Sequence, residues 1–305
     1  MRIVYWNYSR RISVSRGFLT LGIDTDKDQV YYSYALALSI KACDPDAEVC
    51  LIVDKNKSDD VPSKYHHAFD YITELPFGNT GHADGFHGSN FWQLLHCTPF
   101  EENIYLDHDT LVNKVDIDAL WDQFANKDIA VSKKASTFRN LPFNKAHRFE
   151  IEEAYDLPKL FNNMFYFKRD SELAIEWFKM ADPVFQNWRE VYKSLFNDKK
   201  PLSFDKNVLC NVVHSLLDVE NVVTHRITNL YDLDLRAQWL WSEDIPEEWT
   251  EMLNYWYTDE GRLIVENSAI ENGIIHYRDK KFLNQEVLDV IRDQASISRR
   301  RKTTA

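Results

Sequence analysis

Glycine is scarce in this sequence, with 8 residues among 305. Neither a G-x-G-x-x-G nor a G-x-x-x-x-G-K-[ST] pattern occurs anywhere in the chain. These patterns form the backbone loops with which dinucleotide-binding and P-loop proteins hold phosphate groups. Their absence argues against both of those protein classes.

Cysteine and long apolar runs are also in short supply. The four cysteines are scattered and form no C-x-x-C pair, which argues against a zinc knuckle and a disulfide framework. No stretch approaches the roughly 18 apolar residues that indicate a membrane span. Residues 1–17 contain several arginines and lack the apolar core of a secretory signal. We therefore expect a cytoplasmic protein with no membrane span.

Positive charge is outweighed, because the formal net charge is −12. Proteins that bind nucleic acid through its phosphate backbone are usually basic, so nucleic acid is not the partner expected first. Two clusters of basic residues, within 133–148 and at 299–302, keep it open as an acceptor. A solvated loop and a frayed chain end explain these clusters more simply.

The sequence does contain a regular alternation of apolar segments. Residues 17–23, 48–53 and 71–75 are typical of strands, and 31–42 carries apolar residues at helical spacing. The nearly continuous apolar run at 48–53 suits a parallel strand covered on both faces. This order predicts an α/β fold with a mixed, mostly parallel sheet flanked by helices. Strands are also predicted at 104–106, 129–132, 164–167, 221–225 and 273–276, helices at 89–97, 117–124, 172–180 and 206–217, and a turn at 101–103.

One Asp-x-Asp triplet lies where a functional site is expected. Asp107 and Asp109 directly follow the apolar segment 104–106, and open α/β sheets bind ligands beyond the carboxyl ends of their strands. Five further Asp-x-Asp triplets occur, but only this one ends a predicted buried strand. Two carboxylates so spaced can bind one Mn²⁺ or Mg²⁺ ion that also contacts a diphosphate. A polar strand end in an acidic protein is the simpler alternative.

The segment around this triplet resembles a known family. Residues 103–121 (NIYLDHDTLVNKVDIDALW) are similar to the metal-binding segment of retaining GT-A glycosyltransferases related to glycogenin and bacterial galactosyltransferases, glycosyltransferase family 8. The resemblance implies a GT-A, Rossmann-like fold. It also implies transfer of a sugar, with retention, from a nucleotide-sugar donor, of which a UDP-sugar is the favoured type, to a hydroxyl acceptor. In such a site Asp107 contacts the metal or the ribose, and Asp109 binds Mn²⁺ or Mg²⁺.

Two further segments bear on the donor nucleotide and the metal. Residues 19–39 are similar to the family's first strand and helix, where the base and ribose bind. The resemblance assigns Thr20, Asp24 and Tyr31 to the nucleotide, with Tyr32 as an alternative to Tyr31. A loop carboxylate and ordinary core packing of tyrosine are the competing interpretations of Asp24 and of the tyrosines.

The C-terminal segment 275–282 (IHYRDKKF) is similar to the family's "HxxGxxKPW" element. The resemblance makes His276 the third metal ligand, through its neutral imidazole, and places Lys280 or Lys281 at the diphosphate. A histidine satisfied at a strand end is the competing interpretation of His276. The family's glycine is replaced by Asp279, and its Lys-Pro-Trp ending by residues 280–282.

Two segments bear on the sugar. Residues 159–170 (KLFNNMFYFKRD) are similar to the segment that carries asparagines towards it, which implies a role for Asn162 or Asn163; turn formation is the alternative. Residues 203–211 (SFDKNVLCN) are similar to "DQxxLN", which places Asp205 near the anomeric carbon as a polar or nucleophilic group. Asp205 could instead cap a helix. Lys206 stands where the family usually has glutamine.

Several functions remain open at this point. We interpret the chain as one catalytic domain, with a nucleotide-sugar-binding half at 17–132, an acceptor- and metal-completing half at 133–285, and a C-terminal helix and basic tail at 286–305. The favoured acceptor is a carbohydrate or a small hydroxylated molecule. The alternatives are a flipped-out hydroxymethylated cytosine in DNA, a nucleotide-sugar-binding protein without turnover, and a metal-dependent phosphoesterase. The phosphoesterase ranks last because histidine-rich motifs are missing.

Overall fold

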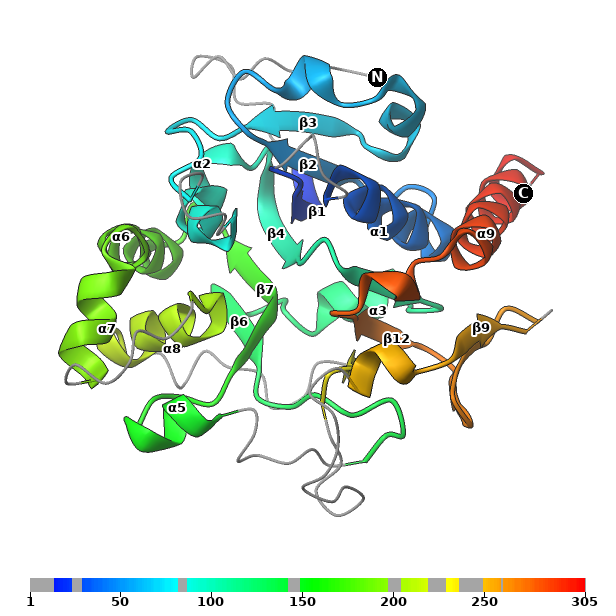
Figure 1. Ribbon diagram of the computed structural model, residues 1–305. Coiled ribbons are helices and arrows are strands. Elements are labelled where there is room, and N and C mark those ends of the chain that lie inside the picture. Colours follow the sequence, from blue (N-terminus) through cyan, green and yellow to red (C-terminus); the bar gives the residue numbers. More distant parts are fainter. Residues whose placement is uncertain are drawn as a thin grey trace.

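The computed structural model describes residues 14–23, 29–81, 87–141, 149–196, 204–218, 229–235, 249–258 and 260–304. A six-stranded sheet in the order β3-β2-β1-β4-β7-β6 forms its centre (Figure 1). The first four strands of that order pair in parallel, whereas β7 runs antiparallel to both of its neighbours. The strands are β1 (Val14–Leu21), β2 (Val49–Val53), β3 (Tyr71–Glu74), β4 (Phe100–Leu106), β6 (Ile129–Ser132) and β7 (Phe161–Lys168). The predicted α/β fold with a mostly parallel sheet is confirmed.

Helices cover both faces of this sheet (Figure 1). Neighbouring residues of β2, Leu51 and Ile52, belong to two different apolar clusters, one packed under α1 and α9 and the other under α6 and α8. Because both faces are buried, β2 is apolar at every position. The helices are α1 (Gln29–Cys43), α2 (Leu94–Cys97), α3 (Ile117–Asp122), α5 (Glu150–Ala154), α6 (Glu172–Gln186), α7 (Trp188–Phe196), α8 (Lys206–Leu216) and α9 (Gln285–Thr304).

A second sheet has the order β5-β12-β8 and joins distant parts of the chain. Its strands are β5 (Thr110–Asn113), β8 (Leu230–Asp232) and β12 (Gly273–His276). His276 lies opposite Thr110 of β5 on one side and opposite Asp232 of β8 on the other. Strand pairing therefore brings the C-terminal histidine beside the segment that follows β4. A third sheet contains β9 (Tyr255–Tyr257), β10 (Leu263–Val265) and β11 (Ser268–Ile270).

Two local predictions are wrong. The turn predicted at 101–103 lies inside β4, where Asn103 is buried and donates from Nδ2 to the carbonyl of Phe167 over 3.3 Å. The helix predicted at 89–97, with Ser89 or Asn90 as its cap, begins instead as the 3₁₀ turn η4 (His87–Gln93) and continues as α2. Buried Asn90 accepts from the backbone of Thr80 and is not a cap. The strand predicted at 221–225 lies outside the described residues.

The structure describes residues 299–302 and the first part of the basic cluster at 133–148. Residues 299–302 belong to α9, so the expectation of a frayed end there is wrong, and Lys302 pairs with Asp46. Arg139 lies 5.3 Å from the centroid of the Phe138 ring. Residues 142–148 lie outside the described part. In the residues that are described, no helix has the length and apolar character needed to cross a membrane; the cytoplasmic location and the division into halves stay predictions.

Candidate metal and donor site

Asp107 lies at the carboxyl end of β4, held by the neighbouring strand. Its backbone N–H donates to the carbonyl of Asn163 over 3.1 Å, which continues the pairing of β4 with β7. Its Oδ1 accepts from the hydroxyl of Tyr105 over 2.7 Å and from Nζ of Lys206 over 2.5 Å. Burial and the adjacent carboxylate raise the pKa of Tyr105 well above its usual range, which keeps its hydroxyl a donor.

Asp109 and His276 meet where β5 begins and β12 ends. His276 Nε2 lies 3.4 Å from Asp109 Oδ1, and Nζ of Lys280 donates to Asp109 Oδ2 over 2.7 Å. Burial opposes ionisation of Asp109, but its cationic neighbours, His276 first among them, hold its pKa well below the usual value. Burial likewise disfavours a charged ring on His276, yet Asp109 and Asp232 raise its pKa well above the usual value.

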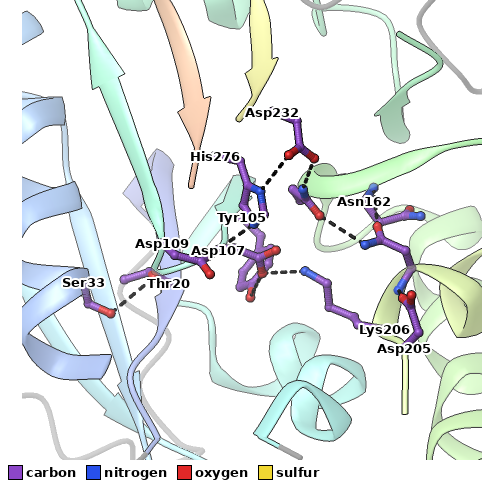
Figure 2. Close-up of polar contacts among 12 residues, drawn as sticks. Thr20, Ser33, Tyr105, Asp107, Asp109, Asn162, Asp205, Lys206, Asp232 and His276 are labelled. Carbon is purple, nitrogen blue, oxygen red and sulfur yellow. Dashed lines mark hydrogen bonds and ion pairs between the residues drawn. The ribbon is translucent and has the colours of Figure 1, made fainter. Parts of the chain in front are cut away.

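The carboxylates of Asp107 and Asp109 and the imidazole of His276 form a compact group. One possible ligand atom from each residue lies within 4.8 Å of the others. Figure 2 shows His276 between Asp109 and Asp232, with its Nδ1 3.5 Å from Asp232 Oδ1. Metal-binding histidines commonly turn their second nitrogen towards a carboxylate, which orients the ring. Two carboxylates and an imidazole suit Mn²⁺, which accepts both oxygen and imidazole ligands, and the residues present fit such an ion.

Asp232 and Asp234 were not among the predicted site residues. Asp232 is buried at the end of β8, and its Oδ2 accepts from Nδ2 of Asn163 over 3.5 Å. Burial and the adjacent Asp232 raise the pKa of Asp234 to about 6. The expectation that only one Asp-x-Asp triplet ends a buried strand is therefore wrong. A sequence signal was present in the apolar residues just before Asp232, but β8 spans only Leu230–Asp232.

The two adjacent asparagines of β7 face different surroundings. Asn163 lies near the metal group, where its Oδ1 accepts from Nδ2 of Asn207 over 3.2 Å. Asn162 is fully buried on the other side, donating to Asn211 Oδ1 over 3.0 Å and lying 3.1 Å from His214 Nε2. The geometry places Asn163 towards the site and Asn162 within the core.

Asp205 is the N-cap of α8. Its Oδ1 accepts from the backbone N–H groups of Asn207, over 2.7 Å, and Val208, over 3.3 Å, which satisfies two of the four donors exposed at a helix start. The capping interpretation of Asp205 thus describes its contacts. The next residue, Lys206, reaches from α8 to Asp107 (Figure 2).

On the donor side the structure distinguishes between neighbouring candidates. Tyr32 packs 6.1 Å from the His108 ring, and Lys280 Nζ lies 5.0 Å from the Tyr32 ring centroid. Its neighbour Tyr31 packs 5.6 Å from the Tyr32 ring and 6.3 Å from that of Tyr65. Lys281 also points elsewhere, donating to Glu251 over 2.8 Å. Tyr32 and Lys280 therefore border the metal group, whereas Lys281 pairs with Glu251; the role of Tyr31 stays a prediction.

Thr20 and Asp24 are the remaining two residues predicted to bind the nucleotide. Thr20 is buried in β1, and its hydroxyl lies 3.5 Å from that of Ser33 (Figure 2). Burial lowers the pKa of His108 below its usual value, which favours a neutral ring beside Tyr32. Asp24 lies outside the described residues.

Comparison with known proteins finds similarity only at the level of structure. No protein-family model matches the chain, and no curated protein sequence matches it. Several of the similar solved structures are named as glycosyltransferases. They include galactosyltransferase LgtC bound to donor and acceptor sugar analogues, with 13% identity, 92% of this chain and 95% of that chain covered, and a TM-score of 0.49. Mouse xyloside xylosyltransferase 1 has 10% identity, coverages of 70% and 85%, and a TM-score of 0.43. Glycosyltransferase GlyE of Streptococcus pneumoniae has 10% identity, coverages of 95% and 64%, and a TM-score of 0.46.

Proposed function

We propose that this chain is a metal-dependent glycosyltransferase that uses a nucleotide-sugar donor, with UDP as the favoured nucleotide. The observation that carries the proposal is the convergence of Asp107, Asp109 and His276 within 4.8 Å of one another at the carboxyl edge of the sheet. Open α/β sheets bind their ligands at this edge. These are also the three residues to which the sequence resemblance assigns the binding of Mn²⁺ or Mg²⁺.

The bound cation would supply positive charge that stabilises the departing nucleotide diphosphate. Lys280 borders the same group, and in this structure its ammonium donates to the carboxylate of Asp109. An ammonium group can donate to other anionic oxygens, such as those of a diphosphate, in the same way. Tyr32 offers a ring beside His108 on which a base or ribose can pack. Catalysis by such a site rests mainly on fixed charges and on positioning of the reactants.

On the sugar side, Asn163 and Asn207 present amide groups near Asp107. Amides of this kind can donate to and accept from sugar hydroxyls. Asp205 fixes the start of α8, from which Lys206 and Asn207 extend to the site. We propose transfer with retention, as the resemblance implies, with Asn163 contacting the sugar and Asp205 acting through the helix end that it caps.

For the acceptor we propose a carbohydrate or a small hydroxylated molecule. Two of the basic residues that suggested DNA make other contacts, since Lys302 pairs with Asp46 and Arg139 lies against Phe138. A binding protein without turnover remains the alternative. It would bind the donor with the metal and release no nucleotide.

The test is nucleotide release from UDP-, GDP-, CMP- and dTDP-sugars in the presence of Mn²⁺. We expect slow release from one donor, and a decrease of 100-fold or more, on the order of several kcal/mol of barrier, in Asp109→Asn. Asp118→Asn is the matched control, because Asp118 belongs to another Asp-x-Asp triplet and its side chain is 79% exposed. Absence of release from every donor, together with absence of a metal-dependent shift in melting temperature, would refute the proposal.

A further inference from the structure

Both carboxylates of the candidate metal site already hold a lysine. Lys206 Nζ lies 2.5 Å from Asp107 Oδ1, and Lys280 Nζ lies 2.7 Å from Asp109 Oδ2. The two pairs differ in exposure, since the Lys206 side chain is 11% exposed and that of Lys280 is 41% exposed. Lys206 is therefore the more firmly enclosed of the two ammonium groups.

The position of Lys206 is fixed by its surroundings. Its Nζ lies 5.0 Å from the ring centroid of Tyr105 and 5.3 Å from that of Phe91, so two aromatic rings hold the cation as well as Asp107. Asp205 caps the helix from which it extends. The sequence resemblance places a neutral glutamine here, so the charge is a property of this chain.

The formal charges of the two pairs cancel, with Asp107 and Asp109 on one side and Lys206 and Lys280 on the other. A divalent cation approaching these oxygens meets two ammonium groups at short range instead of two free carboxylates, and Coulomb repulsion acts strongly in a partly buried site. A buried ammonium displaced without a new partner is also unfavourable. A diphosphate removes both difficulties, because its oxygens can accept from the displaced lysines.

We propose that Lys206 keeps Asp107 paired in the metal-free site and makes binding of the divalent cation conditional on the diphosphate of the donor. The inference rests on the proposed function, because it assumes that Asp107 and Asp109 bind the cation. Lys206 acts here as a positioning residue that competes with the cation for one carboxylate oxygen. By linkage, the factor by which diphosphate tightens cation binding equals the factor by which the cation tightens diphosphate binding.

The experiment measures Mn²⁺ affinity, from the electron paramagnetic resonance signal of free Mn²⁺, with and without saturating UDP. In the unaltered chain we expect UDP to tighten Mn²⁺ binding by about 10-fold or more. Lys206→Met should bind Mn²⁺ alone about 10-fold more tightly and show a much smaller effect of UDP. Lys206→Arg keeps the charge and should behave like the unaltered chain. Lys193→Met, on the exposed face of α7, is the control for loss of a surface lysine.

The outcomes separate the two proposals. Equal Mn²⁺ affinity of Lys206→Met and the unaltered chain without UDP would overturn the role of Lys206 and leave the metal site standing, provided Asp109→Asn abolishes binding. Absence of Mn²⁺ binding in every variant, even with UDP, would overturn both. Lys206→Gln, which restores the family's residue, replaces Lys206→Met if circular dichroism shows that the methionine variant is unfolded, and the same expectations apply to it.

Discussion

Replacement of Asn162 by alanine should destabilise the fold without removing a contact to the substrate. Asn162 is fully buried in β7, and its Nδ2 donates to Asn211 Oδ1 over 3.0 Å. His214 Nδ1 accepts from Nε1 of Trp177 over 3.3 Å, so the ring proton is on Nε2, which donates to Asn162 Oδ1 over 3.1 Å. The network continues from Asn211 Nδ2 to the buried carboxylate of Glu152 over 2.9 Å. Every member lies in the interior between β7, α5, α6 and α8.

The magnitude follows from the groups left without partners. In Asn162→Ala, the Nε2–H of His214 and the Oδ1 of Asn211 each lose a hydrogen bond in the interior. An unsatisfied buried polar group costs about 1–3 kcal/mol, so with two such groups the free energy of unfolding should fall by about 2–6 kcal/mol. With an unfolding entropy of about 2.1 cal/mol/K per residue, that corresponds to a decrease in melting temperature of about 3–9 °C.

Urea unfolding followed by circular dichroism measures this change, and Asn163→Ala is the matched control. Asn163 is the next residue of the same strand, but it is directed at Asp232 and Asn207 beside the metal group. We expect Asn163→Ala to lower the rate of nucleotide release, with a smaller loss of unfolding free energy than in Asn162→Ala. Asn162→Ala should retain release at temperatures where it is folded.

An unchanged unfolding midpoint in Asn162→Ala would refute this interpretation of the network. A loss of donor turnover in the folded Asn162→Ala variant, at unchanged stability, would show that Asn162 contacts the sugar as first considered. The pair of variants therefore distinguishes a structural asparagine from a functional one.

Two further predictions concern stability. Burial lowers the pKa of His214 to about 3, so between about pH 6.5 and pH 3 the unfolded chain binds a proton that the folded chain does not. The free energy of unfolding should therefore decline as the pH falls through this range, by several kcal/mol in all. Urea unfolding from pH 7 to pH 3 should show a shallower decline in His214→Gln than in the unaltered chain. In Gly17→Ala, the added Cβ would lie 2.3 Å from Cζ of the buried Phe100 ring, so we expect the free energy of unfolding to fall by about 1–3 kcal/mol. The double variant with Phe100→Leu should lose less stability than the two single variants together. Additive losses would contradict this contact.

Much of the central sheet could be predicted because its strands are covered on both faces. β2 and β3 appear in the sequence as short apolar runs close to their observed bounds. The start of β4 could not be predicted, because Glu101 is exposed and Glu102 is half-buried there. Polar residues at the start of a strand are difficult to distinguish from a turn. The position of Asp107 and Asp109 at a strand end was correctly predicted; their metal-binding role stays a prediction.

Other parts of the site depend on contacts that no local pattern encodes. Nearly all of α1 is buried, so it has no polar face to fix its rotation, and the sequence could not distinguish Tyr32 from Tyr31. Asp232 reaches the site through the pairing of β8 with β12, which joins segments about 40 residues apart. The short length of β8 gave too few residues for a reliable period. The ion pair of Lys206 with Asp107 spans 99 positions of sequence.

The two sheets meet at the candidate metal group, and this has a consequence for rigidity. Asp107 ends a strand of the large sheet, whereas His276 ends a strand of the small one, whose members have only three or four residues each. Strands so short open locally with little free energy, and a ligand that binds only the closed arrangement raises that free energy. A cation shared between Asp107 and His276 would act as a clasp between the sheets. Binding of the donor and its ion would then oppose separation of the two sheets, which ties the stability of the small sheet to the presence of the substrate.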